Sequence, residues 1–187
     1  MRDRTVNRLV ACTLMVSAIL APACSAQYPR RDPTGERFPS VQGQTLAAQT
    51  VRLPDDVLGT PVLLFVGYEQ STQFDIDRWA LALRQAEVDV RAYEVPTIPG
   101  LGARLAARSI DAGMRSGIPR EDWNVVVTLY DDAGPVARFT GNENGLPARV
   151  LLVNDRGHVV FFHDEGYSLG ALGRLERALA NLKRDPR

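Results

Sequence analysis

Apolar stretches that suit buried strands alternate with amphipathic stretches through the middle of the chain. Residues 61–67 form a continuous apolar run, as a strand that is buried on both faces requires. Apolar side chains then recur at helical spacing through residues 75–85, and residues 88–95 return to strand character. A second amphipathic segment covers residues 101–115, and a third apolar strand covers residues 125–130. This order predicts a βαβ unit in which residues 61–67 are a central parallel strand.

The last quarter of the chain predicts a hairpin followed by a helix. Two apolar strands, residues 148–154 and 158–163, flank Asp155-Arg156-Gly157, a short link that suits a tight antiparallel turn. Leucines then recur on one face of residues 169–182, and Ser168 stands in the capping position before them. The chain therefore closes with an amphipathic helix.

A targeting segment precedes these elements. Arg2, Arg4 and Arg8 lead into an uncharged apolar run over residues 9–23. At about 15 residues the run is shorter than the roughly 20 that a transmembrane helix needs, and it suits a signal peptide. We interpret residues 1–23 as that signal peptide, which predicts an exported protein of the periplasm or cell envelope.

The end of this segment allows two cleavage products. Ala21-Pro22-Ala23-Cys24 resembles a bacterial lipobox, in which Cys24 would carry a lipid and become the first mature residue. Ordinary cleavage after Ala23 or Ala26 is the alternative, because both positions satisfy the requirement for small residues. The lipobox predicts attachment to a membrane through the lipid on Cys24.

Composition bounds the organisation of the rest of the chain. Residues 24–40 are rich in proline and charge, which predicts a flexible linker, and residues 41–187 are long enough for one domain. Lys and Arg number 22, as do Asp and Glu, so the formal net charge is zero. A nucleic-acid partner is not expected, because such proteins carry an excess of positive charge.

Cysteine is scarce in this sequence. Cys12 and Cys24 are the two that it contains, and the first belongs to the predicted signal peptide. Cys24 is lipidated, removed or left alone in the linker. A disulfide within the mature chain is therefore not expected.

The order of elements and several local motifs resemble the thioredoxin-like superfamily, including its membrane-anchored and peroxiredoxin-like members. The motifs lie in residues 38–54, 62–66, 132–139 and 145–159. The resemblance implies an α/β protein with a three-layer α/β/α fold and a mixed central sheet. It also implies that Pro147 follows a cis peptide bond and leaves a backbone edge free to pair with a substrate. A trans proline that merely starts a strand is the alternative.

The same resemblance places a redox motif of two cysteines at the start of the first core helix, where the helix dipole lowers a thiol pKa. In this sequence Gln70 and Gln73 stand at the two positions. Glutamine forms neither a thiolate nor a disulfide, and it does not replace the cysteine metal ligands of copper-delivering relatives. We therefore expect no cofactor, no metal and no enzyme of the thiol-disulfide oxidoreductase or peroxidase type.

The residues around the two glutamines suggest recognition of a partner. Asp75 and Asp77 suit a helix start because of its dipole, and Phe74 and Trp79 are expected in the core. The expected partner is an extended segment of another protein or a small polar ligand. The candidate partner-binding residues are Tyr68, Gln70, Ser71, Thr72, Gln73, Asp75, Arg78, Asn142, Asn144 and Pro147.

Two other classes of function remain as alternatives to a non-catalytic binding or assembly factor. An enzyme of non-thiol chemistry could use Tyr68, Ser71, Asp75 or Arg115 in the same groove, but a hydroxyl nucleophile such as Ser71 needs an adjacent base. The mature chain offers His158 and His163, which we expect to be surface or packing residues of an edge strand. A small-molecule or metal sensor is the other alternative, although adjacent residues in His163-Asp164-Glu165 would point to opposite faces of a strand.

A second resemblance concerns the assembly role. Residues 67–79, with residues 94–98 and 114–118, resemble the thioredoxin-like mitochondrial ATP synthase assembly-factor family. Members of that family act as assembly chaperones without thiol catalysis. The resemblance implies an assembly function and does not name the client protein.

Overall fold

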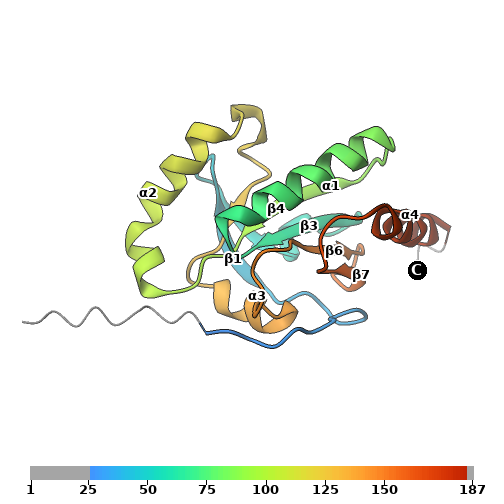
Figure 1. Ribbon diagram of the computed structural model, residues 1–187, viewed down its shortest axis with the longest axis horizontal. Coiled ribbons are helices and arrows are strands. Elements are labelled where there is room, and N and C mark those ends of the chain that lie inside the picture. Colours follow the sequence, from blue (N-terminus) through green and yellow to red (C-terminus); the bar gives the residue numbers. More distant parts are fainter. Residues whose placement is uncertain (1–25, 185–187) are drawn as a thin grey trace, which may run out of the picture.

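A computed structural model of the protein describes residues 26–184, and Cys24 and the predicted signal peptide lie outside these residues. Figure 1 shows how the helices and strands are arranged. The strands are β1 (Val41–Thr45), β2 (Thr50–Leu53), β3 (Val62–Gly67), β4 (Arg91–Pro96), β5 (Val127–Thr128), β6 (Arg149–Val153) and β7 (Val159–His163). The helices are α1 (Gln73–Gln85), α2 (Leu101–Gly117), α3 (Ala133–Thr140) and α4 (Leu169–Arg184), with short 3-10 turns η1 (Asp55–Val57), η2 (Gln70–Thr72) and η3 (Arg120–Asp122).

Four strands form a mixed sheet in the order β4-β3-β6-β7. Strand β3 is parallel to β4 and antiparallel to β6, and β7 is antiparallel to β6. All six residues of β3 are buried, as its continuous apolar sequence predicts. The predicted central strand, the βαβ unit and the closing hairpin are therefore confirmed.

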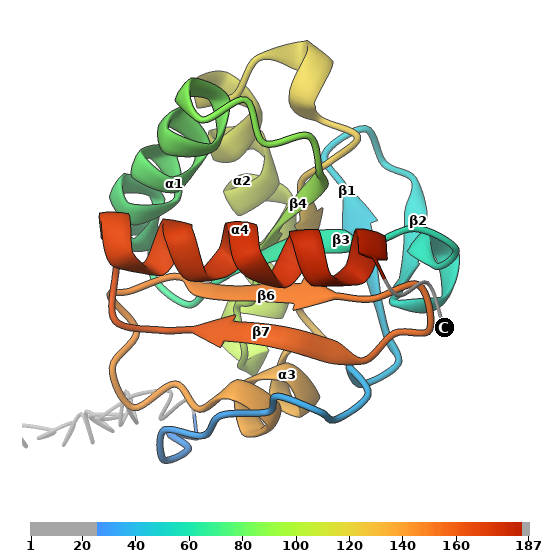
Figure 2. The same cartoon turned by 90° about the vertical axis from the view of Figure 1, so that its right-hand side faces the viewer.

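The sheet is covered on both faces. Successive side chains of a strand point in opposite directions, so a fully apolar strand contributes to a core on each face. Leu63 and Phe65 of β3 pack with α1 and α4, whereas Leu64 and Val66 pack with α3 and the β1–β2 hairpin. Figure 2 shows α4 running alongside β6, with its axis nearly aligned with those of β6 and β7. The three-layer α/β/α architecture follows from these two apolar cores.

The smaller sheet departs from the expected pattern. Its order is β2-β1-β5, and β5 is only two residues long instead of covering residues 125–130. Parallel bridges between Glu94 and Val126 and between Thr97 and Leu129 connect β5 to β4. Helix α3 was not predicted from the sequence, although its proline lies in the first turn, where no backbone donor is lost.

The predicted linker is packed against the domain over the part that the structure describes. Phe38 is buried, and its backbone N–H donates to the carbonyl of Gly157 at 2.8 Å. Arg30 donates to both carboxylate oxygens of Asp164, at 2.7 and 2.8 Å. The expected flexible linker is thus replaced by an ordered segment, because one aromatic residue and several paired backbone groups attach it to the sheet.

Helix α2 is attached differently from the other long helices. It contains no buried residue along its 17 positions.

Between residues 26 and 184, no helix has both the length and the apolar content of a membrane span.

Candidate functional site

The predicted site begins with the loop that connects β3 to α1. The Glu69 side chain and Thr72 form a capping box at the start of η2, in which the Glu69 N–H donates to Thr72 Oγ1 at 3.3 Å. The Glu69 carboxylate lies against Gly145, where any Cβ atom would overlap with it. A glycine at position 145 therefore allows the two loops to approach each other closely.

Two polar side chains join this loop to the segment before β6. Thr72 is buried, and its hydroxyl donates to the carbonyl of Gly145 at 2.9 Å. Asp75 is buried at the start of α1 and accepts the N–H of Ala148 at 3.0 Å and the N–H of Tyr167 at 2.7 Å. Asp75 therefore connects three segments that are far apart in sequence.

Arg149 fixes the rest of that segment from inside the molecule. Its guanidinium donates to the carbonyls of Gly141 at 3.2 Å, Pro147 at 2.7 Å and Asn144 at 2.6 Å. Burial lowers the pKa of Arg149 from its ordinary value, and no carboxylate of residues 26–184 forms an ion pair with it. Three backbone carbonyls therefore stabilise this buried charge by hydrogen bonding.

Tyr68 packs beside this arginine. The Arg149 guanidinium carbon lies 5.2 Å from the centroid of the Tyr68 ring. The Tyr68 hydroxyl is 2.6 Å from Thr140 Oγ1, and burial raises the pKa of Tyr68 to about 12. Tyr68 is thus a half-buried residue whose hydroxyl is engaged inside the molecule.

The predicted cis bond before Pro147 is wrong. The cis peptide bond found among the described residues is Leu53-Pro54, so Leu146-Pro147 is trans. The free backbone edge is also contradicted, because Arg149, Thr72 and Asp75 already bind the carbonyls and the N–H of this segment. The resemblance predicted that the backbone N–H and carbonyl groups of this segment are free to bind a ligand. In the structure, side chains of the same chain already form hydrogen bonds with them.

The outer surface of the site is formed by the start of α1 and by η2. Gln70, Ser71, Gln73 and Arg78 are exposed there. The Gln73 side-chain amide donates to Asp77 Oδ1 at 3.0 Å. These four residues lie where the sequence placed them, and their role in recognition stays a prediction.

Apolar side chains are also exposed on the three segments that Asp75 connects. Phe74 is 70% exposed, Leu146 is 56% exposed and Leu169 is 79% exposed. The expectation that Phe74 lies in the core is wrong, because the helix start turns it away from the sheet, whereas Trp79 is fully buried as expected. Sequence periodicity alone could not separate these two aromatic residues.

The two predicted asparagines have structural partners. Asn142 Oδ1 accepts the N–H of Tyr28 at 2.7 Å, and its amide donates to the carbonyl of Ala26 at 3.2 Å. Asn144 Oδ1 accepts the N–H of Leu146 at 3.2 Å. Asn142 therefore holds the chain's own first described residues, whereas Asn144 shapes the segment before Pro147.

The histidine side chain that ends β7 belongs to the core and not to a catalytic pair. His163 is buried, and its ring centroid lies 5.7 Å from that of Trp79. His163 Nε2 is 2.6 Å from the carbonyl of Gly166, and Nδ1 is 3.4 Å from Arg174. Within the described part of the chain, no group of three or more His, Cys, Asp or Glu residues could hold a metal ion.

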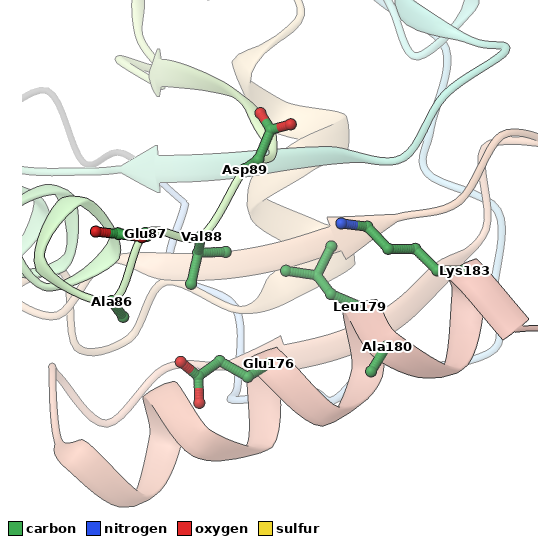
Figure 3. Close-up of a pocket in the computed structure, with 8 residues that line it drawn as sticks. All are labelled: Ala86, Glu87, Val88, Asp89, Glu176, Leu179, Ala180 and Lys183. Carbon is green, nitrogen blue, oxygen red and sulfur yellow. The ribbon is translucent and has the colours of Figure 1, made fainter.

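Two surface hollows lie away from these residues. One, of about 240 Å³, is enclosed by the ends of α1 and α4, and Figure 3 shows the carboxylates of Glu87, Asp89 and Glu176 and the ammonium of Lys183 around it. The other, of about 370 Å³, lies beside the β1–β2 turn. No candidate partner-binding residue lines either of these two hollows, although Arg115, which the alternative enzyme hypothesis included, lines the second one.

Comparison with known proteins identifies the fold. No protein-family model matches the chain, and no curated protein matches its sequence. The thioredoxin domain of a thiol-disulfide oxidoreductase from Bacteroides vulgatus is 20% identical with a TM-score of 0.53, and the match covers 80% of this chain and 99% of that one. The chain has a thioredoxin-like fold.

Two further structures with this fold differ in function. A thiol peroxidase from Chromobacterium violaceum is 13% identical with a TM-score of 0.52, and the match covers 86% of this chain and 93% of that one. A member of the Sco family of cytochrome c oxidase assembly proteins is 12% identical with a TM-score of 0.53, and the match covers 80% of this chain and 95% of that one. The resemblance to ATP synthase assembly factors stays a prediction.

These neighbours correct one expectation. The prediction that the protein is not an enzyme is contradicted, because the similar structures include a thiol-disulfide oxidoreductase and a thiol peroxidase. The prediction rested on the absence of a cysteine pair from the mature chain, with Gln70 and Gln73 at the two motif positions. Thr72, Asp75 and Arg149 form a hydrogen-bonded framework around the same loop.

Proposed function

We propose that the protein is exported, is anchored through a lipid on Cys24, and acts as a binding or assembly factor through the surface around Asp75. The observation that carries this proposal is the convergence of three exposed apolar residues on one framework. Phe74 adjoins Asp75, whereas Leu146 and Leu169 each lie two residues from a backbone N–H that Asp75 accepts. We call Phe74, Leu146 and Leu169 the apolar rim.

The apolar rim provides the attraction for a partner. Covering a large apolar side chain contributes about 1.5–3 kcal/mol, and clustered exposed apolar residues are typical of interaction sites. Gln70, Ser71 and Gln73 border the rim and supply donors and acceptors, each worth about 0.5–1.5 kcal/mol when paired.

An extended protein segment fits this surface better than a small polar ligand does. Such a segment carries apolar side chains for the rim and amide groups for the glutamines. Recognition would use the side chains of this surface, because the backbone of the segment before Pro147 is already paired. The Sco-family neighbour gives a precedent for an assembly protein on the same fold.

Site-specific photo-crosslinking tests the proposal. A photoreactive phenylalanine analogue replaces Phe74 in cells, and Leu81 serves as the matched control because it is also apolar and 53% exposed on α1. Leu81 lies about 10 Å farther along the helix. We expect a discrete adduct from position 74 and a much weaker one from position 81.

The adduct should depend on the rest of the surface. Leu146→Asp, and separately Gln70→Ala with Gln73→Ala, should each reduce the yield while the circular dichroism spectrum stays unchanged. Losing two hydrogen bonds to the partner corresponds to a loss of roughly fivefold to a hundredfold in affinity. Equal adducts from positions 74 and 81, or yields that neither variant changes, would contradict the proposed surface.

The anchor is tested separately from the surface. If Cys24 is lipidated, Cys24→Ser should move the protein from the membrane fraction to the soluble fraction and abolish acyl labelling. Unchanged fractionation of the two forms would mean that ordinary signal cleavage produces the mature chain.

A further inference from the structure

The charged residues that line the hollow beside the β1–β2 turn, Arg115 and Arg120, are both positive. It lies where that turn meets the end of α2 and the segment after it, which is the yellow region in Figure 1. Its volume of about 370 Å³ is within the usual range for small-molecule sites. The lining residues are Leu46, Ala47, Ala48, Arg115, Arg120, Trp123 and Asn124.

The two arginines are held in place around one indole ring. The guanidinium carbons of Arg115 and Arg120 lie 5.8 and 5.6 Å from the Trp123 ring centroid. Arg115 Nε donates to the carbonyl of Leu46 at 2.7 Å, and the indole N–H of Trp123 donates to the carbonyl of Ile118 at 3.1 Å. Arg115 is therefore held by a hydrogen bond and by its contact with the indole ring, and Arg120 is held by its contact with the indole ring.

Neither arginine is neutralised by an ion pair with residues 26–184. The acidic residues nearby do not line the hollow: Glu121 and Asp122 lie in η3, and Asp111 accepts the Tyr130 hydroxyl at 2.7 Å. Arg115 uses Nε for its bond within the fold. Its terminal nitrogens are the donors that bind carboxylate and phosphate groups in proteins.

We propose that this hollow binds a small organic anion, in which a carboxylate or phosphate group is carried on a planar or apolar body. The oxyanion group would lie between Arg115 and Arg120, with the Asn124 amide as a further donor. The exposed methyl groups of Ala47 and Ala48 form an apolar wall for the body of the ligand. The site is independent of the proposed function, because it shares no residue with the apolar rim.

Nuclear magnetic resonance of the indole N–H of Trp123 tests this proposal. The chain has two tryptophans, and Trp123→Phe identifies the signal, since Trp79 is buried in a separate core. The probes are benzoate, its neutral analogue benzamide, and inorganic phosphate, each added to the full mature chain. We expect benzoate or phosphate to cause a saturable shift below about 10 mM, and benzamide to cause none.

Variants locate the effect at the two arginines. Arg120→Gln and Arg115→Gln should each weaken binding by about tenfold or more, since a charge-assisted bond is lost. Arg108→Gln is the matched control on α2, because Arg108 is exposed and does not line the hollow. If Arg115→Gln loosens α2, the result with Arg120→Gln still tests the proposal. Arg120 contacts the indole without a side-chain hydrogen bond to the fold, so its replacement should leave α2 in place.

Each outcome decides the proposal. Tighter binding of benzoate than of phosphate supports a planar carboxylate, and binding of phosphate alone supports a phosphate group. The absence of saturation with both probes, equal shifts with benzamide, or equal weakening by Arg108→Gln and Arg120→Gln would overturn it.

Discussion

Helices α1 and α2 each follow one of the two parallel strands, and both have amphipathic sequences, but only α1 buries its apolar face. Ile76, Trp79 and Leu83 of α1 are buried against the sheet. No residue of α2 is buried, and Leu105 is 81% exposed. Amphipathic periodicity therefore predicts that a segment is helical, and it does not predict how firmly the helix is packed.

Polar contacts replace apolar packing on the α2 side. Arg115 donates to the carbonyl of Leu46, and Tyr130 donates to Asp111 of α2. The predicted recognition surface lies at the start of α1, the firmly packed helix. The hollow proposed to bind an anion lies at the end of α2, the loosely packed helix. The first surface should be rigid, and the second should respond to a ligand by tightening α2.

Truncation of a buried side chain of α1 should cause the largest loss in the free energy of unfolding. Trp79 is fully buried, so Trp79→Ala should lower the free energy of unfolding by about 3–5 kcal/mol. The matched change in α2, Leu105→Ala, should alter it by less than about 0.5 kcal/mol. Urea unfolding measures both, and similar losses for the two variants would show that α2 is packed in solution as α1 is.

Replacement of Arg149, which lies beneath the site, should cause the next largest loss of stability. Arg149→Met leaves three carbonyls without their donor, and even one buried group left unpaired costs about 1–3 kcal/mol. Arg78→Met on the exposed face of α1 is the control and should stay within about 0.5 kcal/mol. A stable Arg149→Met protein with unchanged loop resonances would contradict the organising role of this residue.

The central parallel strand and the closing hairpin could be predicted from the sequence because burial leaves a simple pattern. The apolar run of β3 and the Asp155–Gly157 link each specify a local structure with few alternatives. The packing of Phe38 could not be predicted in the same way, because one aromatic residue among prolines and charges gives no periodicity. The ordered segment depends on contacts with residues more than one hundred positions away.

The candidate site was predicted less completely than the fold. The sequence located Gln70, Gln73 and Asp75 at a helix start, since strand and helix boundaries are local signals. It missed Arg149, whose signal is a single charged residue at the start of an apolar strand. The trans bond before Pro147 could not be predicted either, because the surrounding side chains decide the isomer.

A smaller effect is expected for the polar contacts that hold α2. Tyr130→Phe removes the hydroxyl that binds Asp111 and the carbonyl of Ala107, which should cost about 0.5–1.5 kcal/mol. Hydrogen exchange should accelerate in α2 and stay unchanged in α1, because the lost contact is local. Acceleration that is equal in both helices would mean that they open as one unit.

The smallest change in stability is expected for Glu94, a half-buried residue of β4. Burial raises the pKa of Glu94 above its ordinary value of 4.5, Asp77 and Asp122 raise it further, and the hydrogen bond from Gln73 opposes them. The folded state therefore holds this proton more tightly than the unfolded state does. The resulting stability is present below the ordinary pKa and is lost as the pH rises through the folded value.

Glu94→Gln should remove this pH dependence. The variant should gain stability relative to the wild type at pH 7, and the difference should disappear as the pH falls to about 4. Asp77→Asn should lower the pKa of Glu94 more than Asp122→Asn does, because Asp77 has the larger electrostatic effect on it. Carboxyl carbon resonances measure these values, and a Glu94 pKa at or below 4.5 would contradict burial of this carboxyl group between α1 and η3.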